Sequence, residues 1–280
     1  MAPKVRKLLM IILALVILAC AVWKIALIID EKTQQQKEEE IRNTLKPGAS
    51  FWDHVFPSAF AEEEEVIELP PVSPDFSALL AVNRHAIGWL TAGERIDGPV
   101  VQYNNKFYLT HNLYGEEDSN GTIFMNEANT LYLRDQVWLL HAHFMKNKGM
   151  FGTLTDFIEW SYIQKYPIVT FRTIYDEADV QYVPIAAFHA SMDQDKGTDY
   201  FDLMRINFEN EEEFSAYLRS ITRRSEWSTP VETTPEDQLL ELVTCSYTLG
   251  DGRFILVCRQ LRADETVEDI TELIASYTQE

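Results

Sequence analysis

The chain has 280 residues, of which 46% are hydrophobic and 12% aromatic, enough to bury one sizeable core. Its formal net charge of −20 at pH 7 argues against a nucleic-acid partner, because no basic stripe is present to displace counterions from a phosphate backbone. Three cysteines are too few for a disulfide-rich scaffold.

A membrane anchor is the first element that the sequence predicts. Residues 8–29 are apolar except for Lys24, and as a helix with a rise of ~1.5 Å per residue they can span a bilayer. Basic residues at 4–7 should stay on the cytoplasmic side, while the long side chain of Lys24 can extend to the opposite headgroups. We therefore expect a single-pass cell-membrane protein with residues 1–29 as flank and anchor and an extracellular C-terminal domain.

The alternatives to an anchor are a cleaved signal peptide and a lipoprotein signal ending at Cys20, because residues 17–20 loosely fit a lipidation motif. The apolar core of a signal peptide is only ~7 to 15 residues long, whereas this apolar run continues well past Cys20. The anchor is therefore favoured, with Cys20 buried in the membrane.

Residues 30–73 are predicted to form a stalk and linker. The segment 30–46 is polar, helix-prone and poor in apolar residues, which suits a solvated stalk. A Pro-Gly pair at 47–48 ends it, and prolines and an acidic run at 62–65 follow. The folded domain is expected at residues 74–280.

This domain is predicted to be mainly β with a few helices. Short β-rich runs alternate with turn residues, as is typical of a barrel or a sandwich. The predicted strands lie at residues 87–90, 100–101, 107–109, 122–125, 137–143, 168–175 and 182–188. The predicted helices lie at residues 74–82, 153–165 and 211–223.

A final hairpin at residues 240–261 carries Cys245 on one arm and Arg253 at the foot of the other. If residues 251–252 form a two-residue turn, Cys245 lies opposite Cys258 and a disulfide can form. If the loop has an odd number of residues, Arg253 shares the face of Cys245, where its charge can stabilise a thiolate or an oxyanion. The pattern leaves both alternatives open.

Two groups of residues suggest metal ligands, and neither is convincing. His141 and His143 would share one face of a strand, but no third ligand is evident. Glu209 and the glutamates at 211–213 cluster, but no spaced oxygen-ligand loop is visible, and acidic residues are common where a helix begins. We therefore predict no metal and no cofactor.

Five motifs follow one another along the chain: the N-terminal anchor, Gly-Thr-Ile-Phe at 121–124, Met-Phe-Gly at 150–152, Thr244-Cys245 and Arg253. Taken together, these motifs resemble the sortase family, and in particular its class B branch. Aligning back from 150–152 places the family's catalytic histidine on His143 and not on His141. The similarity covers residues from about 74 to the C terminus.

Three departures from the family pattern bear on substrate preference and rate more than on reaction class. Ala142 stands where the family has glycine and Phe144 where it has asparagine. The family's Thr-Leu-x-Thr-Cys begins with Glu241 in this chain. The aromatic lid motif of the class C branch is not evident before the domain.

The resemblance implies an eight-stranded β-barrel and a cysteine transpeptidase. Cys245 would attack a backbone carbonyl in a C-terminal sorting signal, His143 would protonate the leaving amine, and Arg253 would hold substrate carbonyls or the oxyanion. Thr244 and Ser246 flank the nucleophile as expected substrate contacts. The implied partners are secreted proteins that carry a sorting motif and an amine of the cell-wall peptide.

The rival hypothesis is a non-catalytic extracellular binding module. In it, Cys245 and Cys258 form a structural disulfide, and the acidic surface recruits a partner. Among thiol enzymes, the order with the histidine before the cysteine suits a sortase, because a papain-like peptidase has the opposite order.

Overall fold

The computed structural model describes residues 24–25, 28–29, 32–33, 35–45, 69–246 and 252–279, but not the side chains of Thr198, Cys245 and Ser246. Two compact units are present, Met1–Asn43 and Thr44–Glu280. The described positions of the first unit are helical. Within the described ranges no helix is long and apolar enough to cross a membrane, while the predicted anchor, with Cys20, lies mostly outside them.

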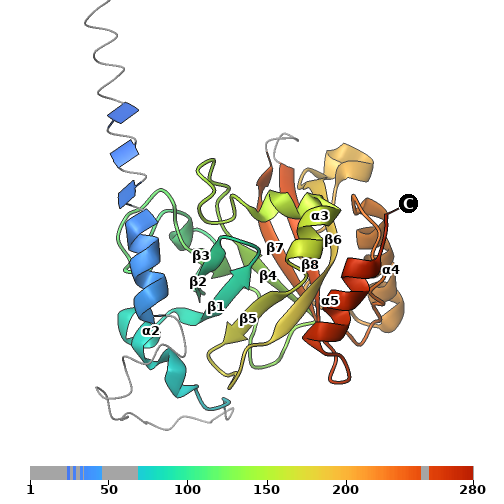
Figure 1. The fold of residues 1–280 in the computed structure, drawn as a ribbon, viewed down its shortest axis with the longest axis horizontal. Helices are drawn as coiled ribbons and strands as arrows, with labels where there is room; N and C mark the ends of the chain where they lie inside the picture. The colour runs from blue at the N-terminus through green and yellow to red at the C-terminus, as the bar shows by residue number, and fades with distance from the viewer. Residues whose placement is uncertain are drawn as a thin grey trace, which may run out of the picture. The chain divides into compact units, whose positions relative to one another are not determined.

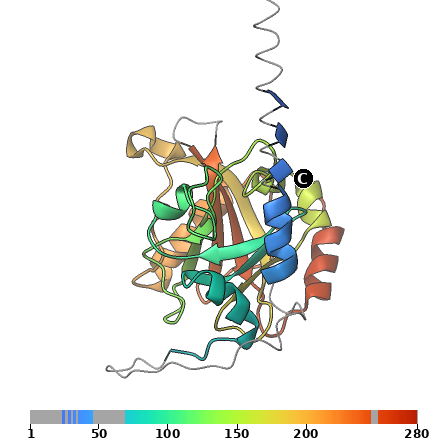
Figure 2. The same ribbon diagram turned by 90° about the vertical axis from the view of Figure 1, so that its left-hand side faces the viewer.

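The second unit is built on a closed eight-stranded barrel, in which the strands follow the order β1-β2-β3-β4-β7-β8-β6-β5 (Figure 1). Figure 2 shows the same barrel from the side. The strands are β1 (Ala86–Ala92), β2 (Ile96–Val101), β3 (Ile123–Met125), β4 (Val137–His141), β5 (Val169–Thr173), β6 (Gln181–Ser191), β7 (Leu239–Ser246) and β8 (Gly252–Gln260). The predicted mainly-β class and the eight-stranded barrel are confirmed.

The helices of this unit are short and lie before, between or after the strands. The α-helices are α2 (Ser77–Val82), α3 (Trp160–Lys165), α4 (Glu211–Arg224) and α5 (Val267–Ser276). The 3-10 helices are η1 (Pro74–Phe76), η2 (Phe107–Leu109), η3 (Leu154–Ile158) and η4 (Gln194–Asp199). The expected helix at 211–223 is therefore confirmed as α4, with Asn210 as its N-cap.

Two predicted elements differ from the structure. Residues 107–109 form the 3-10 turn η2 and not a strand, because the Asn104 side chain accepts hydrogen bonds from the main-chain N–H groups of Lys106 and Phe107. The single helix expected at 153–165 is divided into η3 and α3 at Glu159, whose backbone is extended.

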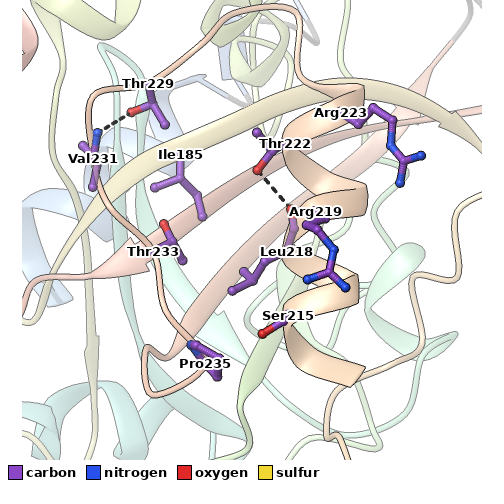
Figure 3. A pocket seen from close by; sticks show the side chains of 10 residues that line it. All are labelled: Ile185, Ser215, Leu218, Arg219, Thr222, Arg223, Thr229, Val231, Thr233 and Pro235. Carbon is purple, nitrogen blue, oxygen red and sulfur yellow. Dashed lines mark hydrogen bonds between the residues drawn. The ribbon is translucent and has the colours of Figure 1, made fainter. Parts of the chain in front are cut away.

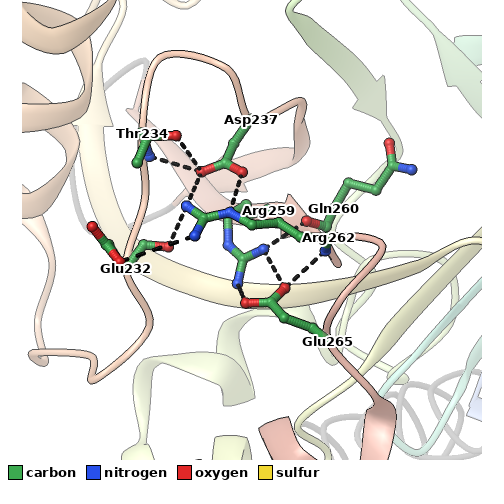
Figure 4. Close-up of polar contacts among 7 residues, drawn as sticks. All are labelled: Glu232, Thr234, Asp237, Arg259, Gln260, Arg262 and Glu265. Carbon is green, nitrogen blue, oxygen red and sulfur yellow. Dashed lines mark hydrogen bonds and ion pairs between the residues drawn. The ribbon is translucent and has the colours of Figure 1, made fainter.

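The hairpin β7–β8 is held firmly at the end where β7 begins and β8 ends (Figure 4). Arg259, whose side chain is fully buried, donates two hydrogen bonds of 2.7 Å to the carboxylate of Glu265. Arg262 donates two of 2.9 Å to Asp237, which precedes β7. Paired, bidentate contacts of this kind fix geometry as well as energy. The Arg262–Asp237 pair ties the segment before β7 to the segment after β8, and the Arg259–Glu265 pair ties β8 to that same segment.

Glu241 is the third residue of β7 and is fully buried. Its Oε1 accepts a hydrogen bond of 2.6 Å from the Tyr217 hydroxyl of α4, so this face of β7 points out of the barrel toward α4. Oε2 has no hydrogen-bond partner among the described residues. Burial raises the pKa of Glu241 to about 7, a shift that the Tyr217 hydrogen bond only partly offsets.

The carboxylate of Glu241 should therefore make stability depend on pH. Its folded-state pKa is above the ordinary value of 4.5, so the protonated fold is favoured, and the free energy of unfolding should fall as pH rises from about 4.5 to about 7. Glu241→Gln keeps an acceptor for Tyr217 without the charge. We expect this variant to be more stable than the parent by about 3 kcal/mol at pH 8. At pH 4.5 the two should be nearly equal.

Denaturant unfolding at both pH values measures the difference. The matched control is Glu212→Gln, an exposed position at the start of α4, which should not change the pH dependence. Equal stability of parent and Glu241→Gln at pH 8 would contradict the prediction.

Candidate active site

The register of β7 and β8 decides between the two readings of the hairpin. Cys245 pairs directly with Arg253, and Ser246 pairs with Gly252. The connecting loop is residues 247–251, an odd number, and directly opposed positions of an antiparallel pair lie on the same face of the sheet. The odd-loop alternative, in which Arg253 shares the face of Cys245, is therefore confirmed.

The other alternative, a disulfide between Cys245 and Cys258, is wrong for the same reason. Cys258 pairs with Leu240, five positions from Cys245 along β7 and on the opposite face. Five residues of strand extend over about 16 Å, far beyond the reach of a disulfide. Cys258 is a free, buried thiol. The rival binding module therefore loses its structural basis.

Strand β4 brings the histidine segment to the same end of the barrel. β4 runs parallel to β7, and His141 pairs with Val243. Beyond the strand, Ala142 N–H donates to Val243 O at 3.3 Å, and the Thr244 hydroxyl donates to Ala142 O at 2.9 Å. Continuing the His141–Val243 register by two residues places the backbone of His143 beside that of Cys245.

The ring of His143 is held by a main-chain carbonyl. Its Nε2 lies 2.6 Å from Leu109 O, and because a carbonyl oxygen only accepts, Nε2 must donate the proton. Nδ1 is then the nitrogen left to exchange a proton with reacting groups. The neighbouring main chain is also held, since Phe151 N–H donates to His143 O at 3.0 Å.

Leu109 itself is fixed by the loop that joins β2 to β3. Thr122 N–H donates to Tyr108 O at 2.9 Å, and the Asn83 side chain donates to the Tyr108 hydroxyl at 2.8 Å. Gly121 has a φ of 66°, and a side chain there would collide with Tyr108 O, so this turn requires glycine. The loop thus presents the Leu109 carbonyl to His143. The sequence gives no signal for such a main-chain role.

His141 is unsuited to proton transfer near neutral pH. It packs against Phe124 with ring centroids 5.2 Å apart, and Asn126 Nδ2 lies 3.2 Å from its Nε2. Burial, helped by the positive charge of Arg253, lowers the pKa of His141 to about 4. The ring is therefore neutral near pH 7. The strand registers place Arg253 near the end of β4, because its partner Cys245 lies two residues beyond Val243, the partner of His141.

The remaining predicted residues lie at the same end. Arg253 is partly exposed, and its Nη1 donates to Gly252 O at 3.0 Å. Thr244 is only 2% exposed, so its hydroxyl serves the contact with Ala142. The side chains of Cys245 and Ser246 lie outside the described residues. No cluster of three or more potential metal ligands occurs among the side chains that are described.

Several known proteins similar to this chain are named sortase B. Sortase B of Staphylococcus aureus is 27% identical over 195 residues, which cover 68% of this chain and 76% of that protein. The S. aureus sortase B–substrate complex superposes with a TM-score of 0.61 at 25% identity, over 69% of this chain and 87% of that chain. A sortase B complexed with triglycine gives 0.60 at 25% identity, over 68% and 87%. No protein-family model matches. The resemblance to class B sortases is confirmed.

The hydrogen bond from the Thr244 hydroxyl to the main-chain oxygen of Ala142 should contribute measurably to stability. Thr244→Val keeps the shape of the side chain but leaves Ala142 O without this donor. We expect the free energy of unfolding to fall by about 1 kcal/mol or somewhat more, as is typical for a buried hydrogen bond. Thr244→Ser, which keeps the hydroxyl, should lose less. Denaturant unfolding of the three proteins compares them, and a Val variant as stable as the parent would show that the bond contributes nothing.

Proposed function

We propose that this protein is a membrane-anchored cysteine transpeptidase of the class B sortase type. It cleaves the C-terminal sorting signal of secreted proteins and transfers them to an amine of the cell wall. The observation that carries the proposal is the β7–β8 register, which pairs Cys245 with Arg253 beside the segment that bears His143. Residues 1–29 serve as the anchor, 30–73 as stalk and linker, and 74–280 as the extracellular catalytic domain.

Acylation begins with the thiolate of Cys245. Its sulfur attacks the carbonyl carbon of the scissile peptide bond, and the carbon–nitrogen bond breaks as the tetrahedral intermediate collapses. His143, as imidazolium, donates the Nδ1 proton to the leaving amine while Nε2–H stays bound to Leu109 O. The product is a thioester between Cys245 and the secreted protein.

Arg253 supplies fixed positive charge at this point. Its guanidinium stays protonated throughout and starts from the residue paired with Cys245, so it is suited to bind the oxyanion or the substrate carbonyls. The same charge disfavours protonation of His141, which supports His143 as the acid. Thr244 and Ser246 flank the nucleophile and are proposed as substrate contacts, Thr244 through its main chain because its hydroxyl is bound to Ala142 O.

Transfer completes the cycle. An amine attacks the thioester carbon and loses a proton to His143, and Cys245 leaves as the thiolate. A sortase B relative has been solved with triglycine, a peptide with a free amine, which supports a glycine-type acceptor for this chain. The substrate complex of S. aureus sortase B supports a peptide sorting signal as the donor.

Cys245→Ala should abolish transfer without unfolding the protein. The assay follows a fluorogenic sorting peptide in the presence of triglycine, and mass spectrometry detects the trapped thioester in the parent. Cys258→Ala is the matched control, because Cys258 is buried on the opposite face of the hairpin and should leave transfer intact. Full transfer by Cys245→Ala would refute the proposal.

The two histidines should differ sharply in their effect. His143→Gln removes the acid, and we expect kcat to fall by at least about 100-fold, the usual contribution of a general acid. His141→Gln should retain most of the activity, because His141 is neutral and packed against Phe124. The opposite ranking in the transfer assay would assign the role to His141 and overturn the assignment.

A further inference from the structure

A groove unrelated to the nucleophile lies beside α4 (Figure 3). Its volume is about 540 Å³, with α4 as one wall and the extended segment 229–235 as the other. Buried aliphatic side chains form its floor: Ile185, Leu218 and Val231. Ile185 belongs to β6 and follows Pro184, the residue that pairs with Cys258 of β8. It therefore lies near the end of the barrel remote from Cys245.

Arginines give the groove its charge. Arg219 and Arg223 are exposed, lie four residues apart on α4 and therefore project from the same side of the helix. Neither makes an ion pair with any described residue. Among the described residues no carboxylate lines the groove, although the chain has 44 Asp and Glu against 24 Lys and Arg. Positive charge is thus concentrated locally on a strongly acidic protein.

In a second groove, by contrast, the arginines are already paired with carboxylates of the chain. Its lining includes two arginines, Arg134 and Arg262, but both are engaged by carboxylates of the chain. Arg134 pairs with Asp176 at 3.4 Å and Arg262 with Asp237 at 2.9 Å. Arginines there stabilise the fold. The guanidinium groups of Arg219 and Arg223 remain available to an external anion.

Hydroxyl groups add hydrogen-bonding capacity to both walls. Ser215 on α4 and Thr233 on the opposite segment have no hydrogen-bond partner among the described residues, whereas the hydroxyl of Thr222 is bound to Leu218 O. A ligand that fits must therefore combine anionic groups, hydrogen-bonding groups and an apolar part that covers the floor. An extended polypeptide with alternating acidic and apolar side chains has all three, because side chains two apart lie on the same face. A sugar–phosphate polymer offers nothing for the aliphatic floor.

We propose that this groove binds an extended acidic segment of a partner protein. Two carboxylates pair with Arg219 and Arg223, and an apolar side chain between them lies over Leu218 and Val231. The guanidinium fork matches a carboxylate bidentately. The proposal does not depend on the transpeptidase assignment, since the groove shares no residue with the candidate active site.

Fluorescence anisotropy of the full-length chain with the labelled peptide Ac-Glu-Leu-Glu-Leu-Glu tests the proposal. The variant Arg219→Gln/Arg223→Gln should bind about tenfold more weakly, because two charge-assisted contacts are lost. The control Arg95→Gln/Lys196→Gln removes the same charge from exposed positions elsewhere and should bind like the parent. Thermal unfolding of each variant verifies the fold.

Two further ligands distinguish binding of an acidic peptide from binding of any apolar peptide or of any polyanion. Ac-Gln-Leu-Gln-Leu-Gln should bind much more weakly than the acidic peptide, and inorganic polyphosphate should not displace it efficiently. Equal loss of affinity in both double variants would show a non-specific effect of net charge and overturn the proposal. So would equal binding of the neutral peptide, or binding of polyphosphate in preference to the acidic peptide.

Discussion

The pairing of β7 with β8 is the constraint on which the candidate active site depends. With five residues in the connecting loop, Cys245 and Arg253 are direct partners. A change of one residue in this loop would turn one of them to the other face of the sheet, because side chains alternate along a strand. The hydrogen-bond register of the two strands thus brings together the backbones of the residue that carries the thiol and the residue that carries the cation.

The histidine reaches the same place by a different route. β4 runs parallel to β7, so the segment after β4 leaves the barrel at the end where β7 carries its cysteine. The bonds Thr244–Ala142 and His143–Leu109 then hold that segment against β7 and against the loop that contains η2. Three elements distant in sequence meet because the barrel is closed and β4 lies between β3 and β7.

Much of this arrangement follows from sequence. The short β-rich runs predict the barrel strands, and the motifs around His143, Cys245 and Arg253 predict which residues matter. The turn at 107–109 is missed because three apolar residues fit a strand as well as a 3-10 turn, and only the Asn104 cap decides. α5 is also missed, although Thr266 marks its start as an N-cap: its hydroxyl accepts from the Asp269 N–H and donates to the Asp269 carboxylate.

Other features have no signal in the side chains of the sequence. The role of Leu109 resides in its main-chain carbonyl, so residue type says nothing about it. In the sequence Glu241 is only a departure from a family motif. The fold shows that its buried carboxyl group accepts a hydrogen bond from the Tyr217 hydroxyl. Whether the loop of the hairpin has an odd or an even number of residues is likewise decided by the pairing of the whole strands.

Arg259, near the end of β8, and Arg262, just beyond it, also make the two ends of the hairpin unequal in local stability. Arg259 and Arg262 hold the end remote from Cys245 through bidentate ion pairs, and the described contacts of the other end include the strand register and the Thr244 hydrogen bond. Local unfolding begins where the fewest stabilising contacts are broken. Main-chain amides near Gly252 should therefore exchange with solvent deuterium sooner than those near Arg259. Cys245, the proposed nucleophile, thus lies at the end of the hairpin remote from these two ion pairs.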